Sequence, residues 1–122
     1  MKDQFAVTDS KVADSDIPEM MTTVADDSQY QRRFQGTQKL YGADAFASFA
    51  AAHVYVIGVG GVGSWVAEAL ARTAVGCVTL VDLDVLVASN VNRQLPALDS
   101  SFGQSKIATM GARMREINPN IE

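Results

Sequence analysis

Four glycines follow a short apolar run in the segment IGVGGVGSW, at Gly58, Gly60, Gly61 and Gly63. Glycine loses more backbone entropy on folding than any other residue, so a cluster marks a place where another group comes very close to the backbone. Asp82 follows Gly63 by nineteen residues. A glycine-rich turn between a strand and a helix, with an acid about twenty residues later, is typical of nucleotide binding, in which backbone N–H groups face phosphates. The pattern therefore predicts a nucleotide site, against the alternative of a tight turn without a ligand.

Three further residues suit the phosphates of ATP. Asn90 and Arg93 belong to the segment SNVNRQ, and Lys106 follows thirteen residues after Arg93. A lone arginine is most often a surface residue, but Lys106 falls in the first turn of a predicted helix, where the helix dipole disfavours a cation. A cation placed against that field indicates an anionic ligand, and two cations would neutralise a pyrophosphate leaving group. We therefore favour ATP chemistry over hydride transfer by a nicotinamide cofactor, which has no such leaving group.

Several neighbouring residues have ordinary structural interpretations. Asp84 suits a loop carboxylate as well as it suits a direct role, and Gln94 is expected to be structural. Trp65 is predicted to pack rather than to form a platform for adenine, and His53 to lie at the surface or at a strand edge. Cys77 opens an apolar run and is expected to behave as a small buried hydrophobic residue rather than a nucleophile.

Alternating helices and strands must position these residues. The expected elements are a helical segment in two pieces broken near Gly36 and Gly42, a strand over 54–57, a helix over 64–73, a strand over 77–81, a loop, and a helix from about 104 to 118. The first strand is apolar on both faces, which is typical of the interior of a parallel sheet. The order predicts an α/β fold: the N-terminal half of a Rossmann-like, doubly wound parallel sheet, preceded by helices and a mobile acidic tail. Because two parallel strands cannot complete such a sheet, we expect later strands to lie beyond Glu122.

Composition and charge limit the class of protein. The chain has 122 residues, a formal net charge of -4 and 48% hydrophobic residues, which is typical of a globular protein with one domain at most. Residues 1–28 hold seven acids against two lysines and show no lasting periodicity, which predicts a disordered acidic tail before a domain over 29–122. No apolar stretch reaches the roughly 18 residues of a membrane span, and no signal peptide is expected. A lone cysteine excludes an internal disulfide, so we expect a cytoplasmic protein without a membrane partner.

Several motifs carry a resemblance to a known family. This sequence resembles the adenylating domain shared by ubiquitin-activating enzymes and ThiF-type sulfur-carrier adenylyltransferases. Four motifs carry the resemblance: GVGGVGS, LVDLD, SNVNRQ and GQSK. Within that superfamily the tRNA threonylcarbamoyladenosine dehydratases are most similar, in RRFQGTQKLYG, GGVGSWVAEALARTAVG, NVNRQLPAL and REINP. The similarity runs from about Tyr30 to the end of the chain.

The resemblance implies an enzyme that uses ATP and Mg²⁺ to adenylate a carboxylate, after which a nucleophile displaces AMP. In the dehydratase branch the carboxylate belongs to threonylcarbamoyladenosine in tRNA, and attack within the same group closes a ring with net loss of water. By motif match, the four glycines would line the nucleotide and Asp82 would bind the ribose hydroxyls. Asn90, Arg93 and Lys106 would contact the phosphates, with Arg93 and Lys106 as the catalytic residues. The resemblance also implies a homodimer, with residues 30–42 as a candidate contact.

Two departures limit what the resemblance transfers. Sulfur-carrier adenylyltransferases supply an arginine to the neighbouring subunit's phosphates from a motif of the type R-Y-x-R, and this sequence has Gly36 in that slot. Arg33 lies nearby, but the simpler hypothesis is that this branch does without that arginine. The family's magnesium-binding aspartate and any catalytic cysteine would lie beyond Glu122, so we expect no metal ligand within the chain and no complete reaction from it alone.

Three alternatives remain open from the residues. A sulfur-carrier-protein adenylyltransferase has the same fold, and many of them carry paired Cys-x-x-C zinc motifs that this chain lacks. An NAD-dependent oxidoreductase is less favoured and would bind NAD without depending on ATP. The last alternative is a nucleotide-binding interaction module without catalysis.

Overall fold

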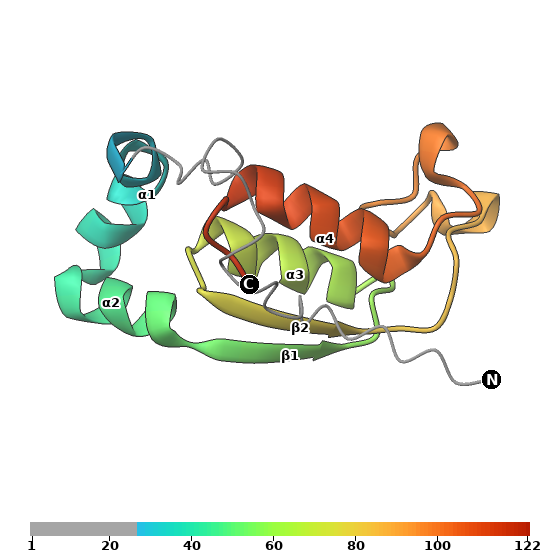
Figure 1. Ribbon diagram of the computed structural model, residues 1–122. Helices are drawn as coiled ribbons and strands as arrows, with labels where there is room; N and C mark the ends of the chain where they lie inside the picture. Colours follow the sequence, from blue (N-terminus) through green and yellow to red (C-terminus); the bar gives the residue numbers. More distant parts are fainter. Residues whose placement is uncertain (1–26) are drawn as a thin grey trace, which may run out of the picture.

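The computed structural model describes residues 27–122, which form four helices and a short parallel sheet; two helices lie on one face of the sheet and two lie beyond the end where the strands begin (Figure 1). The elements in chain order are α1 (Asp27–Tyr41), α2 (Ala43–Ala51), β1 (His53–Ile57), α3 (Gly63–Arg72), β2 (Cys77–Val81), 3-10 turns at Ala88–Asn90 and Asp99–Ser101, and α4 (Lys106–Ile117). The predicted acidic tail lies, up to residue 26, outside the described residues. Its last two residues instead begin α1. None of the helices over 27–122 is long and apolar enough to cross a membrane.

The sheet confirms the two predicted strands and extends toward a third. β1 and β2 pair in parallel over their whole length, with Ile57 beside Val81 at the carboxyl end. On the other edge of β2, the Val78 N–H donates to the Glu122 carbonyl (2.8 Å) and the Glu122 N–H donates to the Gly76 carbonyl (2.9 Å). These two bonds have the pattern of a parallel pairing. The last residue of the chain thus lies where a further parallel strand would pair with β2.

The core lies between the sheet and the helices α3 and α4, which cover the same face of the sheet (Figure 1). Alternate strand residues point into it, so that Val56 of β1 and Leu80 of β2 are almost fully buried. Ala67 of α3 and Met110 and Met114 of α4 fill the space against them. Burial of a valine, leucine or methionine side chain contributes about 1.5–3 kcal/mol. The apolar stripe predicted for the last helix is confirmed as core.

Within residues 27–122 the opposite face of the sheet carries no helix. Tyr55 and Ile57 of β1 are 63% and 81% exposed there. His53 stacks on Tyr55 at the exposed start of β1, and its Nε2 lies 2.8 Å from the Thr79 hydroxyl oxygen. Cys77 is half-buried, and its burial raises the pKa of the thiol, which therefore stays protonated. The described residues cover one face of the sheet, although β1 is apolar on both.

The predicted helix break near Gly36 is wrong, because α1 runs through that residue without interruption. A glycine inside a helix costs about 1 kcal/mol relative to alanine, and neighbouring contacts outweigh this cost. Phe34 is buried, and Arg33 Nη1 donates to two carbonyl oxygens at the end of α4, at 2.8 and 3.1 Å. The chain breaks only at Gly42, whose φ of +89° ends α1 and leads into α2. Arg33 therefore caps α4 within its own chain.

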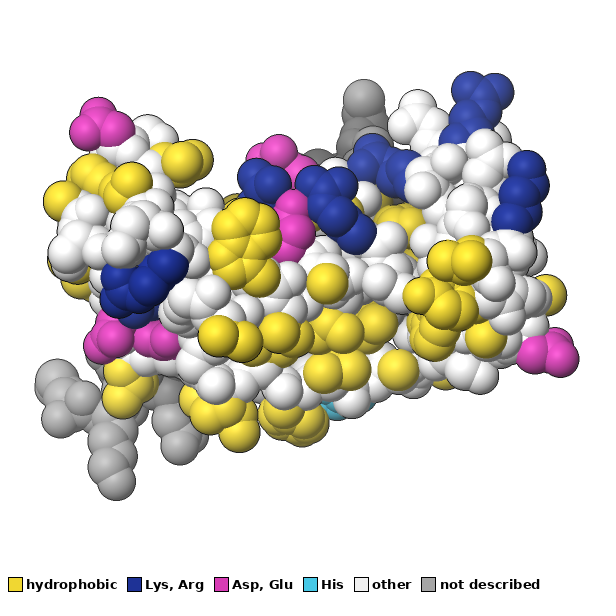
Figure 2. Space-filling model, turned by 180° about the vertical axis from the view of Figure 1, so that it is seen from behind, with side chains coloured by type: hydrophobic (Ala, Val, Ile, Leu, Met, Phe, Trp, Pro, Cys, Tyr) yellow, Lys and Arg dark blue, Asp and Glu magenta, His cyan; other side chains and the backbone are white. Residues whose placement is uncertain are grey.

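An ion cluster joins α3 to α4. The Glu68 carboxylate is bound by Arg113 at 2.7 Å and by Arg72, one helical turn away, at 2.8 Å. The hydrogen bond from Arg113, and then that from Arg72, lowers the pKa of Glu68, although burial acts in the opposite direction. Figure 2 shows basic and acidic side chains mixed along the upper, helical part of the molecule, with hydrophobic side chains below them. Glu68 therefore ties the two helices together through two arginines, one from each helix.

Candidate nucleotide site

The turn between β1 and α3 leaves a row of backbone donors open. Gly58 has a φ of +92°, which glycine adopts without strain, and its N–H donates to the Val81 carbonyl at 2.7 Å. From Gly60 to Val62 the backbone N–H groups form no hydrogen bond within residues 27–122, and α3 begins directly after them at Gly63. Open N–H groups at a helix N-terminus, together with the helix dipole, favour anions. The turn has the geometry that the glycine pattern predicts.

Close packing requires glycine at one position of the turn and favours it at a second. A β-carbon at Gly63 would collide with the carbonyl oxygen of Gly58, so only glycine allows α3 to start this close to the end of β1. A β-carbon at Gly61 would lie 3.1 Å from Cγ of Arg93, a distance tighter than an ordinary contact. The first close approach sets the position of α3. The second brings a cation of a distant loop onto the turn.

A shallow pocket of about 490 Å³ lies over the turn and beside β1. Its lining combines turn backbone with apolar side chains: Tyr55, Val56, Ile57, Gly58, Gly60, Val62, Gly63 and Val66. The volume falls in the range of small-molecule sites. An apolar wall next to a row of N–H donors suits a ligand with a flat apolar part and an anionic part, as a nucleotide has.

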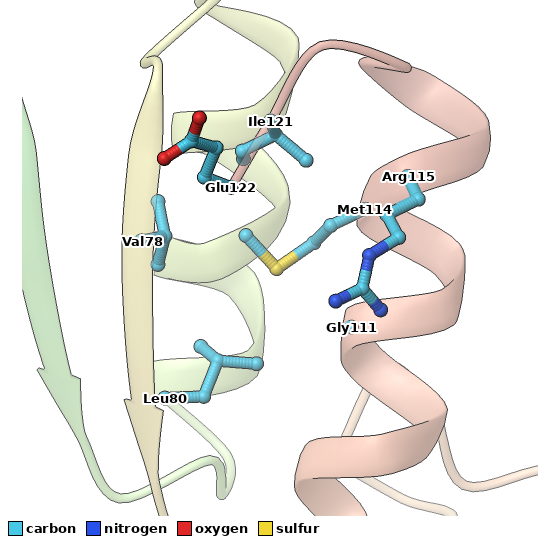
Figure 3. A pocket seen from close by; sticks show the side chains of 7 residues that line it. All are labelled: Val78, Leu80, Gly111, Met114, Arg115, Ile121 and Glu122. Atoms are coloured by element: carbon cyan, nitrogen blue, oxygen red, sulfur yellow. The ribbon is translucent and has the colours of Figure 1, made fainter. Parts of the chain in front are cut away.

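A second cavity, between β2 and α4, is a packing gap. Its volume is about 10 Å³. Figure 3 shows Met114 of α4 directed toward β2, where Val78 and Leu80 face it. A space of this size holds at most one water molecule, so it is no ligand site.

Asp82 ties the end of β2 to the glycine turn. Its Oδ2 accepts a hydrogen bond from the Val59 N–H (2.7 Å), and its Oδ1 accepts one from the Asp84 N–H (2.8 Å). Both bonds lie at the carboxyl ends of the strands, the edge at which doubly wound folds bind their ligands. The structure thus places the predicted ribose-binding carboxylate beside the glycine turn, and its contact with a ribose stays a prediction.

Lys106 is the first residue of α4 and lies almost fully buried at the same edge. Its Nζ is 3.3 Å from Oδ2 of Asp84, with side-chain exposures of 7% for the lysine and 74% for the aspartate. Its backbone N–H also donates to the Asp84 carbonyl at 3.1 Å. The sequence predicted an anionic ligand for Lys106, and in this structure its anion is Asp84. This pairing links Lys106, through Asp84 and Asp82, to the glycine turn.

Asn90 and Arg93 shape the loop that follows β2. Asn90 is buried, and its Oδ1 accepts a hydrogen bond from the Val87 N–H at 3.1 Å, which closes the first 3-10 turn. The guanidinium of Arg93 is exposed, and its Nη1 donates to the Ser89 carbonyl (3.1 Å) and to Asn92 Oδ1 (2.9 Å). Asn90 therefore has a structural partner, whereas Arg93 reaches the glycine turn with its side-chain stem. A phosphate contact for either residue stays a prediction.

Three polar residues at this site were not predicted to act there. Ser64, fully buried, and Trp65 bond the start of α3 to the loop that carries Arg93. Gln94 is buried as well, and its Nε2 lies close to Gly60. Among the described residues, its Oε1 is the one buried side-chain atom that has no hydrogen-bond partner. The one available signal in the sequence was position, since Ser64 and Trp65 directly follow the last glycine and Gln94 follows Arg93.

The described residues offer no site for a metal ion. No group of three or more His, Cys, Asp or Glu side chains in residues 27–122 is arranged to hold one. The two carboxylates nearest the turn already have partners, in backbone N–H groups for Asp82 and in Lys106 for Asp84.

Known proteins are similar to this chain in sequence and in fold. The chain is 50% identical over 99 residues to the tRNA threonylcarbamoyladenosine dehydratase of Escherichia coli K12, a stretch that covers 81% of this chain and 37% of that protein. It is 47% identical over 90 residues to the protein of the same name from Bacillus subtilis, covering 74% of this chain and 35% of the relative. The solved structure of the E. coli enzyme, TcdA, in complex with AMP superimposes with a TM-score of 0.76 at 49% identity, over 77% of this chain and 38% of that one.

The same enzyme has also been solved in complex with ATP, with the same TM-score of 0.76. The chain spans less than two-fifths of the length of these relatives. The model of the ThiF family matches residues 30–122, which include the glycine turn, Asp82, Arg93 and Lys106. The chain belongs to the ThiF family.

Proposed function

We propose that this chain is the N-terminal part, over residues 29–122, of the ATP-binding domain of a tRNA threonylcarbamoyladenosine dehydratase. The observation that carries the proposal is the meeting of three distant segments at one edge of the sheet. The open glycine turn, the linked carboxylates Asp82 and Asp84 with Lys106, and the stem of Arg93 all lie there. Anion donors and two cations suit a polyphosphate. The names and the AMP and ATP complexes of the similar proteins support the same ligand and substrate.

Each residue receives a role from this arrangement. The four glycines line the nucleotide, and Asp82 binds the ribose hydroxyls while it holds the turn. Arg93 and Lys106 bind the phosphates and stabilise the charge of the leaving pyrophosphate, and Asn90 holds the loop near them. For this, Lys106 exchanges Asp84 for a phosphate, and Arg93 leaves the carbonyl and amide oxygens of its own loop.

The reaction has two steps. The threonyl carboxylate of the modified adenosine attacks the α-phosphorus of ATP, forming an acyl-adenylate and releasing pyrophosphate. A nucleophile within the same side chain then attacks the activated carbonyl carbon, closes the ring and expels AMP, which carries away the oxygen of the lost water. Mg²⁺ would shield the phosphates during the first step, with ligands from outside the described residues. A homodimer in the cytoplasm, with tRNA as the substrate, completes the proposal.

The test uses the full-length protein with ATP, Mg²⁺ and tRNA that carries threonylcarbamoyladenosine. AMP release is followed, and the tRNA is digested for mass spectrometry. We expect AMP only in the presence of tRNA, together with a nucleoside lighter by one water. AMP or an acyl-adenylate formed instead with a small ubiquitin-like carrier protein, with unchanged tRNA, would assign the protein to sulfur transfer.

A further inference from the structure

Two side chains in the first turn of α3 hold the loop that carries Arg93. Ser64 donates from Oγ to the Gly60 carbonyl at 2.5 Å, and the same Oγ accepts a hydrogen bond from the Leu95 N–H at 3.2 Å. Trp65 donates its indole N–H to the Arg93 carbonyl at 3.0 Å. The two bonds to the loop fall at Arg93 itself and two residues later. They fix the backbone around Arg93 to the helix that ends the glycine turn.

The first half of the Arg93 side chain lies close to the glycine turn as well. Its Cγ and Cδ would lie 3.1 and 3.2 Å from a β-carbon at Gly61, so the stem rests on the turn. The guanidinium alone is left free to change partners. Its present acceptors, the Ser89 carbonyl and Asn92 Oδ1, belong to exposed residues of its own loop. Both acceptors are neutral oxygens, and an anionic phosphate is a stronger acceptor for a guanidinium.

Packing alone does not explain the position of Trp65. Its side chain is 56% exposed, so it contributes little to the core. A tryptophan that is more than half exposed gains less from burial than one in the core. The contact that remains to account for its position is the hydrogen bond to Arg93. The chain has no second tryptophan that could take the same place.

We propose that Trp65 and Ser64 are positioning residues that hold Arg93 at the β- and γ-phosphates of ATP. The inference rests on the proposed function, which assigns those phosphates to Arg93. Neither residue touches the phosphates itself, since each acts through the backbone on one side of Arg93. Fixing a charged group in this way matters because a displacement of about 1 Å at a reacting centre can cost on the order of 100-fold in rate.

The position of Arg93 can be measured through the nucleotide. AMP lacks the β- and γ-phosphates, so loss of positioning weakens ATP binding and leaves AMP binding unchanged. Damage to the glycine turn itself would weaken both. Calorimetry with the full-length protein would compare ATP and AMP binding to the wild type, to Trp65→Phe, which keeps an aromatic ring without the N–H, and to Ser64→Ala. Each variant would also be made together with Arg93→Ala.

We expect each single variant to weaken ATP binding about 3- to 10-fold, the range of one hydrogen bond, with AMP binding changed less than about twofold. In the Arg93→Ala background the same changes should have less than about a twofold effect, because coupled residues are not additive. Thr73→Val is the matched control. Its hydroxyl donates to the Ala69 carbonyl at 2.6 Å at the C-terminal end of α3, opposite the end that carries Ser64 and Trp65, so both affinities should stay unchanged.

Equal losses for ATP and AMP, or an undiminished effect of Trp65→Phe in the Arg93→Ala background, would overturn the inference. If Ser64→Ala does not fold, because Ser64 is fully buried, the cycle with the half-exposed Trp65 decides alone. A wild type that binds ATP but leaves tRNA unchanged would refute the proposed function and still allow this cycle to be completed. A wild type that binds no ATP would refute both.

Discussion

The two ends of α3 use charge in opposite ways. At its C-terminal half, Glu68 is held by Arg72 and Arg113, so that each charge has a close partner of opposite sign. At its N-terminal end, the N–H groups before Gly63 are open, and the nearby cation Arg93 bonds to neutral oxygens of its own loop. We call Glu68, Arg72 and Arg113 the closed cluster. The open N–H groups, with Arg93 and the Lys106–Asp84 pair beside them, are the open cluster.

The closed cluster stabilises the packing of two helices, and the open one leaves its groups available. Lys106 shows the difference most clearly, because its side chain is 7% exposed while that of its partner Asp84 is 74% exposed. Burial of an ammonium costs free energy, and a pair with a well-solvated carboxylate returns little of it. Local departures from what stability favours are expected at functional sites. The contrast supports the proposal that the N-terminal end of α3 meets the ligand.

The largest effect should come from removing a cation of the open cluster. Lys106→Ala or Arg93→Ala should lower turnover by about 100-fold or more, because each stabilises charge that develops on the phosphates. ATP binding should fall much less. Steady-state assays of AMP release by the full-length protein would measure both. Arg115→Ala, on the exposed face of the same helix as Lys106, is the control and should keep the wild-type rate. Wild-type turnover in both cation variants would leave Arg93 and Lys106 without a catalytic role.

The close approach of Gly63 to the Gly58 carbonyl sets the position of α3. Gly63→Ala should lower the free energy of unfolding by about 1–3 kcal/mol, because the new methyl group collides with the Gly58 carbonyl and must push α3 away. Gly36→Ala is the matched control. Nothing lies within 4 Å of its β-carbon position in α1, so alanine should stabilise the helix by about 0.5–1 kcal/mol. Urea unfolding would compare the two, and equal effects would show that α3 tolerates displacement.

The sequence was sufficient for the elements that follow from local pattern. The two strands, the helix after the glycine turn and the last helix with its methionine stripe are confirmed within one or two residues, because apolar periodicity and turn residues mark them. The break predicted near Gly36 is wrong, because glycine was given more weight than the tertiary contacts of Phe34 and Arg33. Helix propensity is a weak term that such contacts override.

At the site, the residues of the motif were found but their partners were not. Nothing in the spacing indicates that Asp84 pairs with Lys106, twenty-two residues later, or that Trp65 bonds to Arg93. Such contacts depend on how β2, its loop and α4 return to the same edge of the sheet. A motif names the residue types that a ligand needs, whereas the residues that hold them are set by the three-dimensional fold.

The closed cluster should act on stability alone. Glu68→Gln should lower the free energy of unfolding by about 1–2 kcal/mol, the loss of charged hydrogen bonds reduced by the partial exposure of both arginines. ATP affinity should not change. Chemical unfolding and calorimetry on the same protein would separate the two readouts. A Glu68→Gln protein with wild-type stability and weakened ATP binding would contradict the division of α3 into a structural and a ligand-binding end.

The smallest effect is the pH dependence of that cluster. The folded-state pKa of Glu68 lies below its ordinary value of 4.5, because Arg113 and Arg72 bond to the carboxylate. A lowered pKa contributes stability that is fully present above the unfolded-state value and is lost as the pH falls through the folded-state value. The difference in unfolding free energy between the wild type and Glu68→Gln should therefore be constant at neutral pH and shrink below pH 4.5. A difference that stays constant into the acid range, measured by urea unfolding at a series of pH values, would mean that the arginines hold Glu68 through its shape and not its charge.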